Sequence, residues 1–382
     1  MREIVEEMRT QLAAGSGGAL VTIVRTTGSV YRREGAKMLC LPGGRLVGSI
    51  SGGCLESDVY EASQDVVAQQ RPILAGYDTN SENDNVWGLG LGCNGTVEVL
   101  IEPLDWWRGA AGRALFDALS RHVEAGERCA LVTAFGAGDG HPLPGIQRVL
   151  VDAHGAVVGE PASAFEEAEL DAAVDLLVNE RVRPSRKLRV GAREVFVDVI
   201  VPPTPLLVVG AGHDAAPLVR MARELGFVVT LIDSRERFAT RERFPEADFA
   251  LCVRPPDFAS KVSFAGSPAV VLMTHNYLVD REILGQILVS DAPFTYVGAL
   301  GPHARTESML RELREEGLAL REDKVAQIRT PIGIDIGAES PAEIALSVLA
   351  EVLSVRNGRR PVPLREKKGK IHLPEANVEK SS

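Results

Sequence analysis

The segment LLVVGAGHDAAPLVRMARELGFVVTLIDSR, residues 206–235, constrains the fold more than any other part of the chain. It reads as a strand, a glycine turn containing Gly210 and Gly212, a helix, and a second strand that ends at Asp233. Ala215 stands where a third glycine often lies. Glycines at these positions let a pyrophosphate approach the backbone, the helix N-terminus favours its charge, and the acid suits ribose hydroxyls. These features together match the dinucleotide-binding fingerprint, so the segment predicts a dinucleotide-type binding unit. A related fold that has lost its nucleotide is the alternative.

The residues after this unit continue the same architecture. Apolar runs at residues 249–253, 269–273 and 295–300 alternate with helical patterns, which predicts a doubly wound parallel sheet over residues 204–357. A final helix begins near Ser340, a predicted N-cap with Pro341 and Glu343 in its first turn. The basic, proline-containing residues 358–382 are expected to form a mobile tail.

Loops at the carboxyl ends of parallel strands are where open α/β sheets bind ligands, so histidines there are candidate site residues. His213 lies at the predicted helix N-terminus, where a neutral ring is favoured over imidazolium. Such a ring is able to contact a phosphate, and helix capping is the alternative. His275, Asn276 and Arg305 lie in the loops that follow later strands.

The first 200 residues contain a weak internal repeat. QLAAGSGGALVTIVRTTGSVYRREGAKMLCLPGGRLVGS aligns with HVEAGERCALVTAFGAGDGHPLPGIQRVLVDAHGAVVGE, and TVEVLIEPL near Glu98 with VFVDVIVPP near Asp198. We infer an N-terminal α+β domain over 1–200 with duplicated halves 1–108 and 109–200. Its first half is predicted to contain a hairpin that turns at residues 42–44.

Two of the five cysteines lie in glycine loops of the first half only. Cys54 ends SGGC and Cys93 ends LGC, and each precedes a new element. Nearby N–H dipoles favour thiolates at such places, which makes these two cysteines candidate soft-metal ligands or nucleophiles. Small residues that pack tight turns are the alternative. The other three lie in apolar strand patterns and are predicted to be core residues; these are Cys40, Cys129 and Cys252.

Composition excludes several classes of protein. The net charge is −10 and the sequence pI is about 5.4, which argues against a nucleic-acid surface. The sequence has no CxxC pattern, no secretory leader pattern and no run of about twenty apolar residues. We expect a soluble, cytoplasmic protein with neither a nucleic-acid nor a membrane partner.

Taken together, the motifs resemble the XdhC/CoxI family, the accessory factors of xanthine dehydrogenase and related molybdenum hydroxylases. The resemblance is carried by GSVYRREGAKM, GRLVGSISGGCLES, GLGLGCNGTVEVLIEP, VVGAGHDAAPL, LIDSR, MTHNYLVD, YVGALGP and TPIGIDIGAESPAEIALSVLAEVL. These segments cover nearly the whole chain except its middle and its tail. The loop LGPHAR departs from the more usual LGSRRK-like version.

The resemblance implies a non-catalytic maturation factor that binds molybdenum cofactor and assists its sulfuration and insertion into a molybdenum hydroxylase. It implies that hydroxylase and a cysteine desulfurase as partners, and a homodimer. No catalytic residue is predicted, and Cys54 and Cys93 are the predicted metal ligands. The predicted cofactor-binding residues are Ser51, Gly52, Gly53, Cys54, Gly92, Cys93, Gly210, Gly212, His213, Asp233 and His275.

The alternative function is an NAD(P)-dependent oxidoreductase, suggested by Gly210, Gly212 and Asp233. Such an enzyme needs an acid or base beside the nicotinamide and no thiol in the N-terminal domain. A scaffold whose nucleotide-type domain binds nothing is the third possibility.

Overall fold

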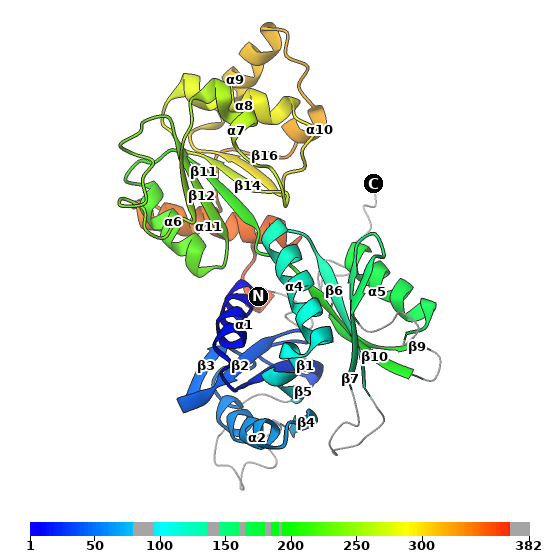
Figure 1. Cartoon of the computed structure of the whole chain (residues 1–382). Coiled ribbons are helices and arrows are strands. Elements are labelled where there is room, and N and C mark those ends of the chain that lie inside the picture. The colour runs from blue at the N-terminus through cyan, green and yellow to red at the C-terminus, as the bar shows by residue number, and fades with distance from the viewer. Residues whose placement is uncertain (79–94, 136–145, 160–164, 180–184, 191–192, 367–382) are drawn as a thin grey trace. The chain divides into compact units, whose positions relative to one another are not determined.

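The computed structural model describes residues 1–78, 95–135, 146–159, 165–179, 185–190 and 193–366 (Figure 1). The chain divides into two compact units, Met1–Pro202 and Pro203–Ser382. The fold is mixed α/β, with antiparallel sheets in the first unit and a parallel sheet in the second, as the sequence predicts. Within these described ranges, no helix is both long and apolar enough to cross a membrane.

The first unit contains two five-stranded sheets with the same strand order. The orders are β3-β2-β1-β5-β4 and β8-β7-β6-β10-β9. This shared topology supports the duplication inferred from the sequence. The strands of the first sheet are β1 (Ala19–Gly28), β2 (Lys37–Leu41), β3 (Arg45–Gly48), β4 (Ile73–Asp78) and β5 (Gly95–Pro103). Those of the second are β6 (Cys129–Phe135), β7 (Ile146–Asp152), β8 (Val157–Gly159), β9 (Arg186–Val190) and β10 (Arg193–Ile200).

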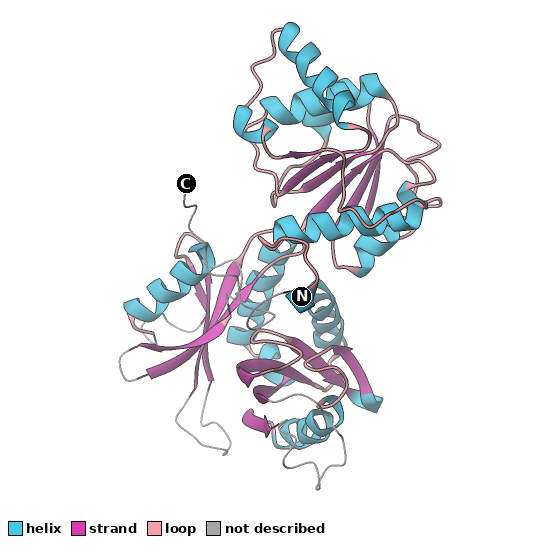
Figure 2. Ribbon diagram, turned by 180° about the vertical axis from the view of Figure 1, so that it is seen from behind, coloured by secondary structure: helices cyan, strands magenta, loops and turns pink. Residues whose placement is uncertain are grey.

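Each sheet of the first unit buries both of its faces. Helices α1 (Arg2–Ala14) and α4 (Ala110–Ala125) share one apolar core with a face of each sheet. The opposite faces are covered by α2 (Glu56–Gln69) and α5 (Glu167–Asn179), as Figure 2 shows. The predicted hairpin between β2 and β3 is confirmed, with a 3-10 turn at Pro42–Gly44.

Two buried ion pairs join the two halves. Lys37 on β2 bonds Asp198 on β10, and Arg148 on β7 bonds Glu102 on β5 at 2.8 and 3.0 Å. All four side chains are at most 5% exposed, and they line one small cavity of about 20 Å³. The cation of each half is therefore neutralised by the carboxylate of the other half.

The strand register shows that these two pairs are equivalent. Lys37 lies opposite Thr22, and Arg148 opposite Thr133, in the matching ALVT strands. Leu20 lies opposite Glu102, just as its counterpart Leu131 lies opposite Asp198. Glu102 is therefore the residue of the first half that corresponds to Asp198, a register that period-two alternation alone does not fix.

The second unit is a six-stranded parallel sheet ordered β13-β12-β11-β14-β15-β16. Its strands are β11 (Pro205–Val209), β12 (Val228–Asp233), β13 (Phe249–Cys252), β14 (Ala269–Leu272), β15 (Tyr296–Ala299) and β16 (Ile328–Arg329). Its helices are α6 (Ala215–Glu224), α7 (Phe258–Lys261), α8 (Tyr277–Val289), α9 (His303–Glu315), α10 (Glu322–Val325) and α11 (Pro341–Arg356).

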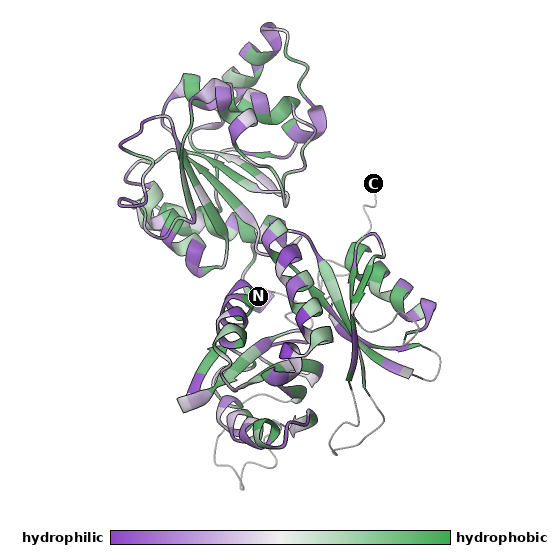
Figure 3. Ribbon diagram, in the orientation of Figure 1, coloured by the Kyte–Doolittle hydropathy of each residue, from purple (hydrophilic) through white to green (hydrophobic). Residues whose placement is uncertain are grey.

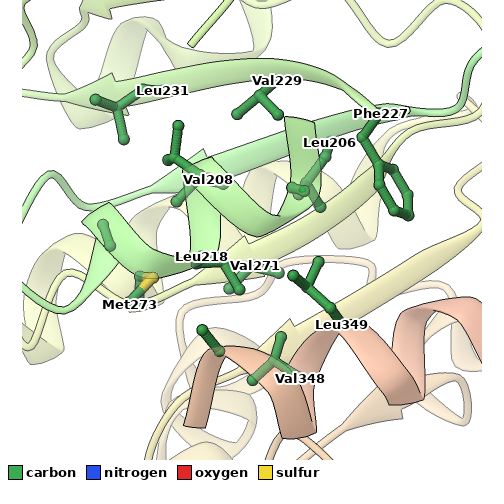
Figure 4. Packing of buried hydrophobic residues seen from close by; sticks show 14 of the residues in the cluster. Leu206, Val208, Leu218, Phe227, Val229, Leu231, Val271, Met273, Val348 and Leu349 are labelled. Atoms are coloured by element: carbon green, nitrogen blue, oxygen red, sulfur yellow. The ribbon is translucent and has the colours of Figure 1, made fainter. Parts of the chain in front are cut away.

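Helices cover both faces of this sheet, so its strands are almost uniformly hydrophobic (Figure 3). Helices α6 and α11 pack on one face, where Leu218 and Leu349 meet the side chains of β11, β12 and β14 (Figure 4). Helices α7, α8 and α9 pack on the other face. The predicted capping box at the start of α11 is confirmed, with reciprocal bonds between Ser340 and Glu343.

Candidate functional site

The order of the parallel sheet reverses between β11 and β14, and open α/β sheets bind ligands in the crevice at such a point. The turn after β11 closes tightly onto β14. Gly210 has φ +117°, and a Cβ there would lie 2.5 Å from the carbonyl oxygen of Met273. Glycine is therefore required at residue 210 by the fold itself.

A hydrogen bond connects the two loops at this crevice. The ring Nε2 of His275 lies 2.7 Å from Oδ2 of Asp214, and His275 adopts a left-handed backbone with φ +57°. Asp214 precedes α6, and a Cβ at Gly212 would lie 2.4 Å from its Oδ1. The predicted residues Gly212 and His275 thus lie around a carboxylate that no sequence motif singled out. His213 is exposed and is not the N-cap of α6.

Two other polar residues of these loops make structural bonds. The Asn276 side chain accepts the N–H groups of Leu278 and Val279 and caps α8. Arg305 forms an ion pair at 2.9 Å with Asp280, whose side chain is 2% exposed. Both side chains therefore have a structural role in these loops.

Asp233 ends β12 as predicted, but all of its acceptor capacity is used. Oδ1 accepts from the backbone N–H and Nε of Arg235, both at 2.9 Å. Oδ2 accepts from Nη2 of Arg235 and from the N–H of Ala211, both at 2.8 Å. Burial alone would raise the pKa of Asp233, but these hydrogen bonds hold it below its usual value. The same bonds raise the pKa of Arg235, so both groups stay charged.

The glycine loop before α2 is organised by Ser51 and Glu56. The Ser51 hydroxyl bonds the Glu56 carboxylate and accepts the N–H groups of Gly53, Cys54 and Leu55 at 3.1–3.2 Å. Glu56 also accepts the Ser51 N–H at 2.9 Å and the Gly53 N–H at 3.1 Å. Burial would raise the pKa of Glu56, but the hydrogen bonds lower it overall, with Ser51 contributing most.

These bonds change how the loop can bind a ligand. The N–H groups expected to approach a bound group are turned toward Ser51 and Glu56. Cys54 is half-buried and packs against the apolar core between α2 and the first sheet. Its neighbour Gly53 has φ +108° and open space at its Cβ position. The other predicted loop residues, Gly92 and Cys93, lie outside the described residues. Among the residues that are described, no three His, Cys, Asp or Glu side chains cluster as a metal site.

The remaining cysteines divide into two kinds. Cys40 and Cys129 are buried as predicted, and burial raises the pKa of the Cys40 thiol to about 11 and that of Cys129 to about 12. The prediction that Cys252 is a core residue is wrong. It lies exposed on the edge strand β13, where its Sγ is 3.6 Å from the carbonyl oxygen of Ser234.

We expect alkylation to separate these thiols. Iodoacetamide at pH 8 should modify Cys252 first and Cys54 more slowly, while Cys40 and Cys129 stay unmodified until the protein unfolds, because the reactive form is the thiolate. Peptide mass spectrometry over time measures each rate. Modification of Cys40 in folded protein as fast as Cys252 would contradict the burial of the Cys40 thiol.

Sequence reasoning missed the residues that organise these loops, which are Glu56 in the first unit and Asp214 and Arg235 in the second. Each is adjacent to a predicted residue or within two or three positions of one. Glu56 is an acid in the first turn of α2, a position where acids are favoured, and that was its local signal. An arginine two residues after the acid of the fingerprint was the signal for Arg235.

Comparison with known proteins agrees with this architecture. Residues 206–352 match the family model described as the XdhC Rossmann domain, and residues 11–78 match the XdhC and CoxI family. A crystal structure from Bacillus halodurans, described as a xanthine dehydrogenase, aligns with a TM-score of 0.73 and 30% identity. That alignment covers 94% of this chain and 96% of the other.

Two curated relatives extend over most of the chain. A Bacillus subtilis protein, named as a probable xanthine dehydrogenase subunit, is 30% identical over 88% of this chain and 92% of its own length. The Escherichia coli molybdenum cofactor insertion chaperone PaoD is 23% identical, over 90% of this chain and 85% of its own length. The identity and coverage of the first relative, together with the two family matches, show that the chain belongs to the XdhC and CoxI family.

Proposed function

We propose that this protein is a maturation factor that binds molybdenum cofactor as cargo and assists its insertion into a xanthine dehydrogenase-type hydroxylase. The observation that carries the proposal is the similarity to a molybdenum cofactor insertion chaperone along 90% of the chain. The proposed partners are the hydroxylase apoenzyme and a cysteine desulfurase that sulfurates the bound cofactor. The protein is proposed to act as a homodimer.

The site geometry supports this function in two places. The crevice between β11 and β14 lies at the switch point of the parallel sheet, where the glycine turn leads into the N-terminus of α6, and such a place suits a phosphate-bearing ligand. The loop of the first unit contains Cys54, whose half-buried thiol is a soft donor of the kind that suits a sulfur-rich metal centre. Cys54 alone does not complete a metal site. In this proposal Cys93 or the cargo's own sulfurs supply the rest.

No specific observation favours the alternative function, an NAD(P)-dependent oxidoreductase. The acid that suggested a ribose diol, Asp233, has all four acceptor positions occupied by Ala211 and Arg235. The fingerprint therefore supports a phosphate-bearing ligand more directly than it supports hydride chemistry.

We expect Cys54→Ser to lose bound molybdenum cofactor and to leave the partner hydroxylase inactive. Serine keeps the size of the side chain but removes the soft donor, so the fold should persist. Cofactor content after oxygen-free purification from a molybdenum-replete host, together with hydroxylase activation, measures the effect. Full activation by Cys54→Ser would show that the thiol is not a ligand.

Cys40→Ser is the control for Cys54→Ser. Cys40 lies on β2 in the core of the first unit at 1% exposure, so its replacement should lower stability and leave cofactor content per folded protein unchanged. Loss of cofactor in both variants would point to a general weakening of the unit rather than to the Cys54 thiol.

A further inference from the structure

We propose that Arg235 recognises a phosphate group on the ligand of the β11–β14 crevice, at the position where a dinucleotide fold ordinarily binds a ribose diol. The inference rests on the proposed function only in taking this crevice as the ligand site. It adds the chemical class of that ligand, a phosphomonoester rather than an unmodified nucleotide ribose. It also names Arg235 as the residue that determines this specificity.

The first step is that Asp233 cannot accept a ligand hydroxyl. A carboxylate has about four acceptor positions. In Asp233 two acceptor positions are filled on each carboxylate oxygen. The donors are the N–H of Ala211 and the backbone N–H, Nε and Nη2 of Arg235. The Asp233 side chain is also 4% exposed, so a ribose hydroxyl would have to displace a buried ion pair to reach it.

The second step is that Arg235 keeps its other edge available. Nε and Nη2 donate to Asp233, whereas Nη1 makes no hydrogen bond within the described part of the chain. The Arg235 side chain is 52% exposed. The Nη1–Nη2 edge of a guanidinium has the spacing that binds two oxygens of one phosphate.

The third step is that Arg235 is held in place and lies in a cationic segment. Its guanidinium carbon lies 3.8 Å from the ring centroid of Phe238, and that of Arg243 lies 4.4 Å from the same ring. Residues 233–243 contain four arginines and three acids. The ion pair with Asp233 and the stacking restrict the rotamers of Arg235, which lowers the entropy lost on binding an anion.

The test uses NADP⁺ and NAD⁺ as probes, because they differ only in the 2′-phosphate. The full-length protein should bind NADP⁺ about 10- to 100-fold more tightly than NAD⁺, as measured by calorimetry at fixed salt. In Arg235→Met this ratio should fall to about one or below, because the phosphate partner is lost and Asp233 regains free acceptors. Equal binding of the two probes by the unaltered protein would overturn the proposal.

Two variants keep the result interpretable. Arg241→Met removes one cation from the same segment and should keep the NADP⁺ preference. If Arg241→Met lost as much of the preference as Arg235→Met, the preference would come from the general positive charge of the segment and not from specific recognition by Arg235. Arg235→Lys should lower the preference several-fold because an ammonium lacks the two-pronged edge. If Arg235→Met does not fold, an unchanged ratio in Arg235→Lys overturns the proposal.

Cofactor content distinguishes this inference from the proposed function. Protein that retains molybdenum cofactor but shows no phosphate preference would refute the role of Arg235 alone. Protein that prefers NADP⁺ but never holds molybdenum cofactor would refute the maturation role and leave phosphate recognition intact.

Discussion

Arg148→Met lowers the free energy of unfolding of the first unit by about 3–5 kcal/mol, because it leaves the Glu102 carboxylate buried without its cation. Glu102 is 3% exposed and would keep only the Trp107 indole N–H, at 2.8 Å, among the bonds described for its side chain. Urea unfolding followed by tryptophan fluorescence measures the loss. All three tryptophans lie in the first unit, so the signal reports on that unit.

The double variant Arg148→Met/Glu102→Gln should recover much of that loss, since the amide oxygen still accepts from Trp107 and no unpaired charge remains. Arg113→Met is a surface control. Arg113 pairs with Asp117 on the exposed side of α4, and its removal should cost at most about 0.5 kcal/mol. Equal losses at Arg148 and Arg113 would contradict a central role for the buried pair.

Gly210→Ala destabilises the second unit by about 2–4 kcal/mol, the sum of a left-handed backbone penalty and an overpacking penalty. The backbone at residue 210 has φ +117°, and the new Cβ would lie 2.5 Å from Met273 O. That oxygen belongs to a backbone fixed beside β11, so it cannot move aside cheaply. Hydrogen exchange of peptides from β11 and β14 measures the change within the second unit.

Gly226→Ala separates the two causes. Gly226 also has a positive φ, +81°, but nothing lies within 4 Å of its Cβ position. It should therefore show only the backbone penalty of about 1 kcal/mol. A Gly210→Ala loss no larger than that of Gly226→Ala would show that the contact with Met273 is not limiting.

The crossed ion pairs explain why both halves of the first unit stay together. Each half places one cation and one carboxylate on the face that meets the other half, and neither half neutralises its own charges. An isolated half would carry two charged side chains on its main apolar face without the partners that neutralise them. Burying charges in this way favours one register of the two sheets over any shifted arrangement, because a shift would separate all four groups.

The sequence by itself determined the elements and the family. Helical and alternating periodicity located α1, the β2–β3 hairpin and the parallel strands, because those patterns depend on neighbours a few residues away. The glycines of the fingerprint and the N-cap at Ser340 are local signals of the same kind. Cys252 was misplaced because an apolar strand pattern does not show that β13 is an edge strand.

Only the tertiary structure decided which polar groups remain available to a ligand. Asp233 keeps its place in the fingerprint, but Arg235 and Ala211 fill its acceptors, and the N–H groups of the Cys54 loop are turned toward Ser51 and Glu56. Sequence spacing cannot reveal this, because hydrogen-bond capacity is used up by partners whose position depends on backbone direction and packing. For the same physical reason the pairing of Lys37 with Asp198, 161 residues apart, emerged only when the two sheets were brought face to face.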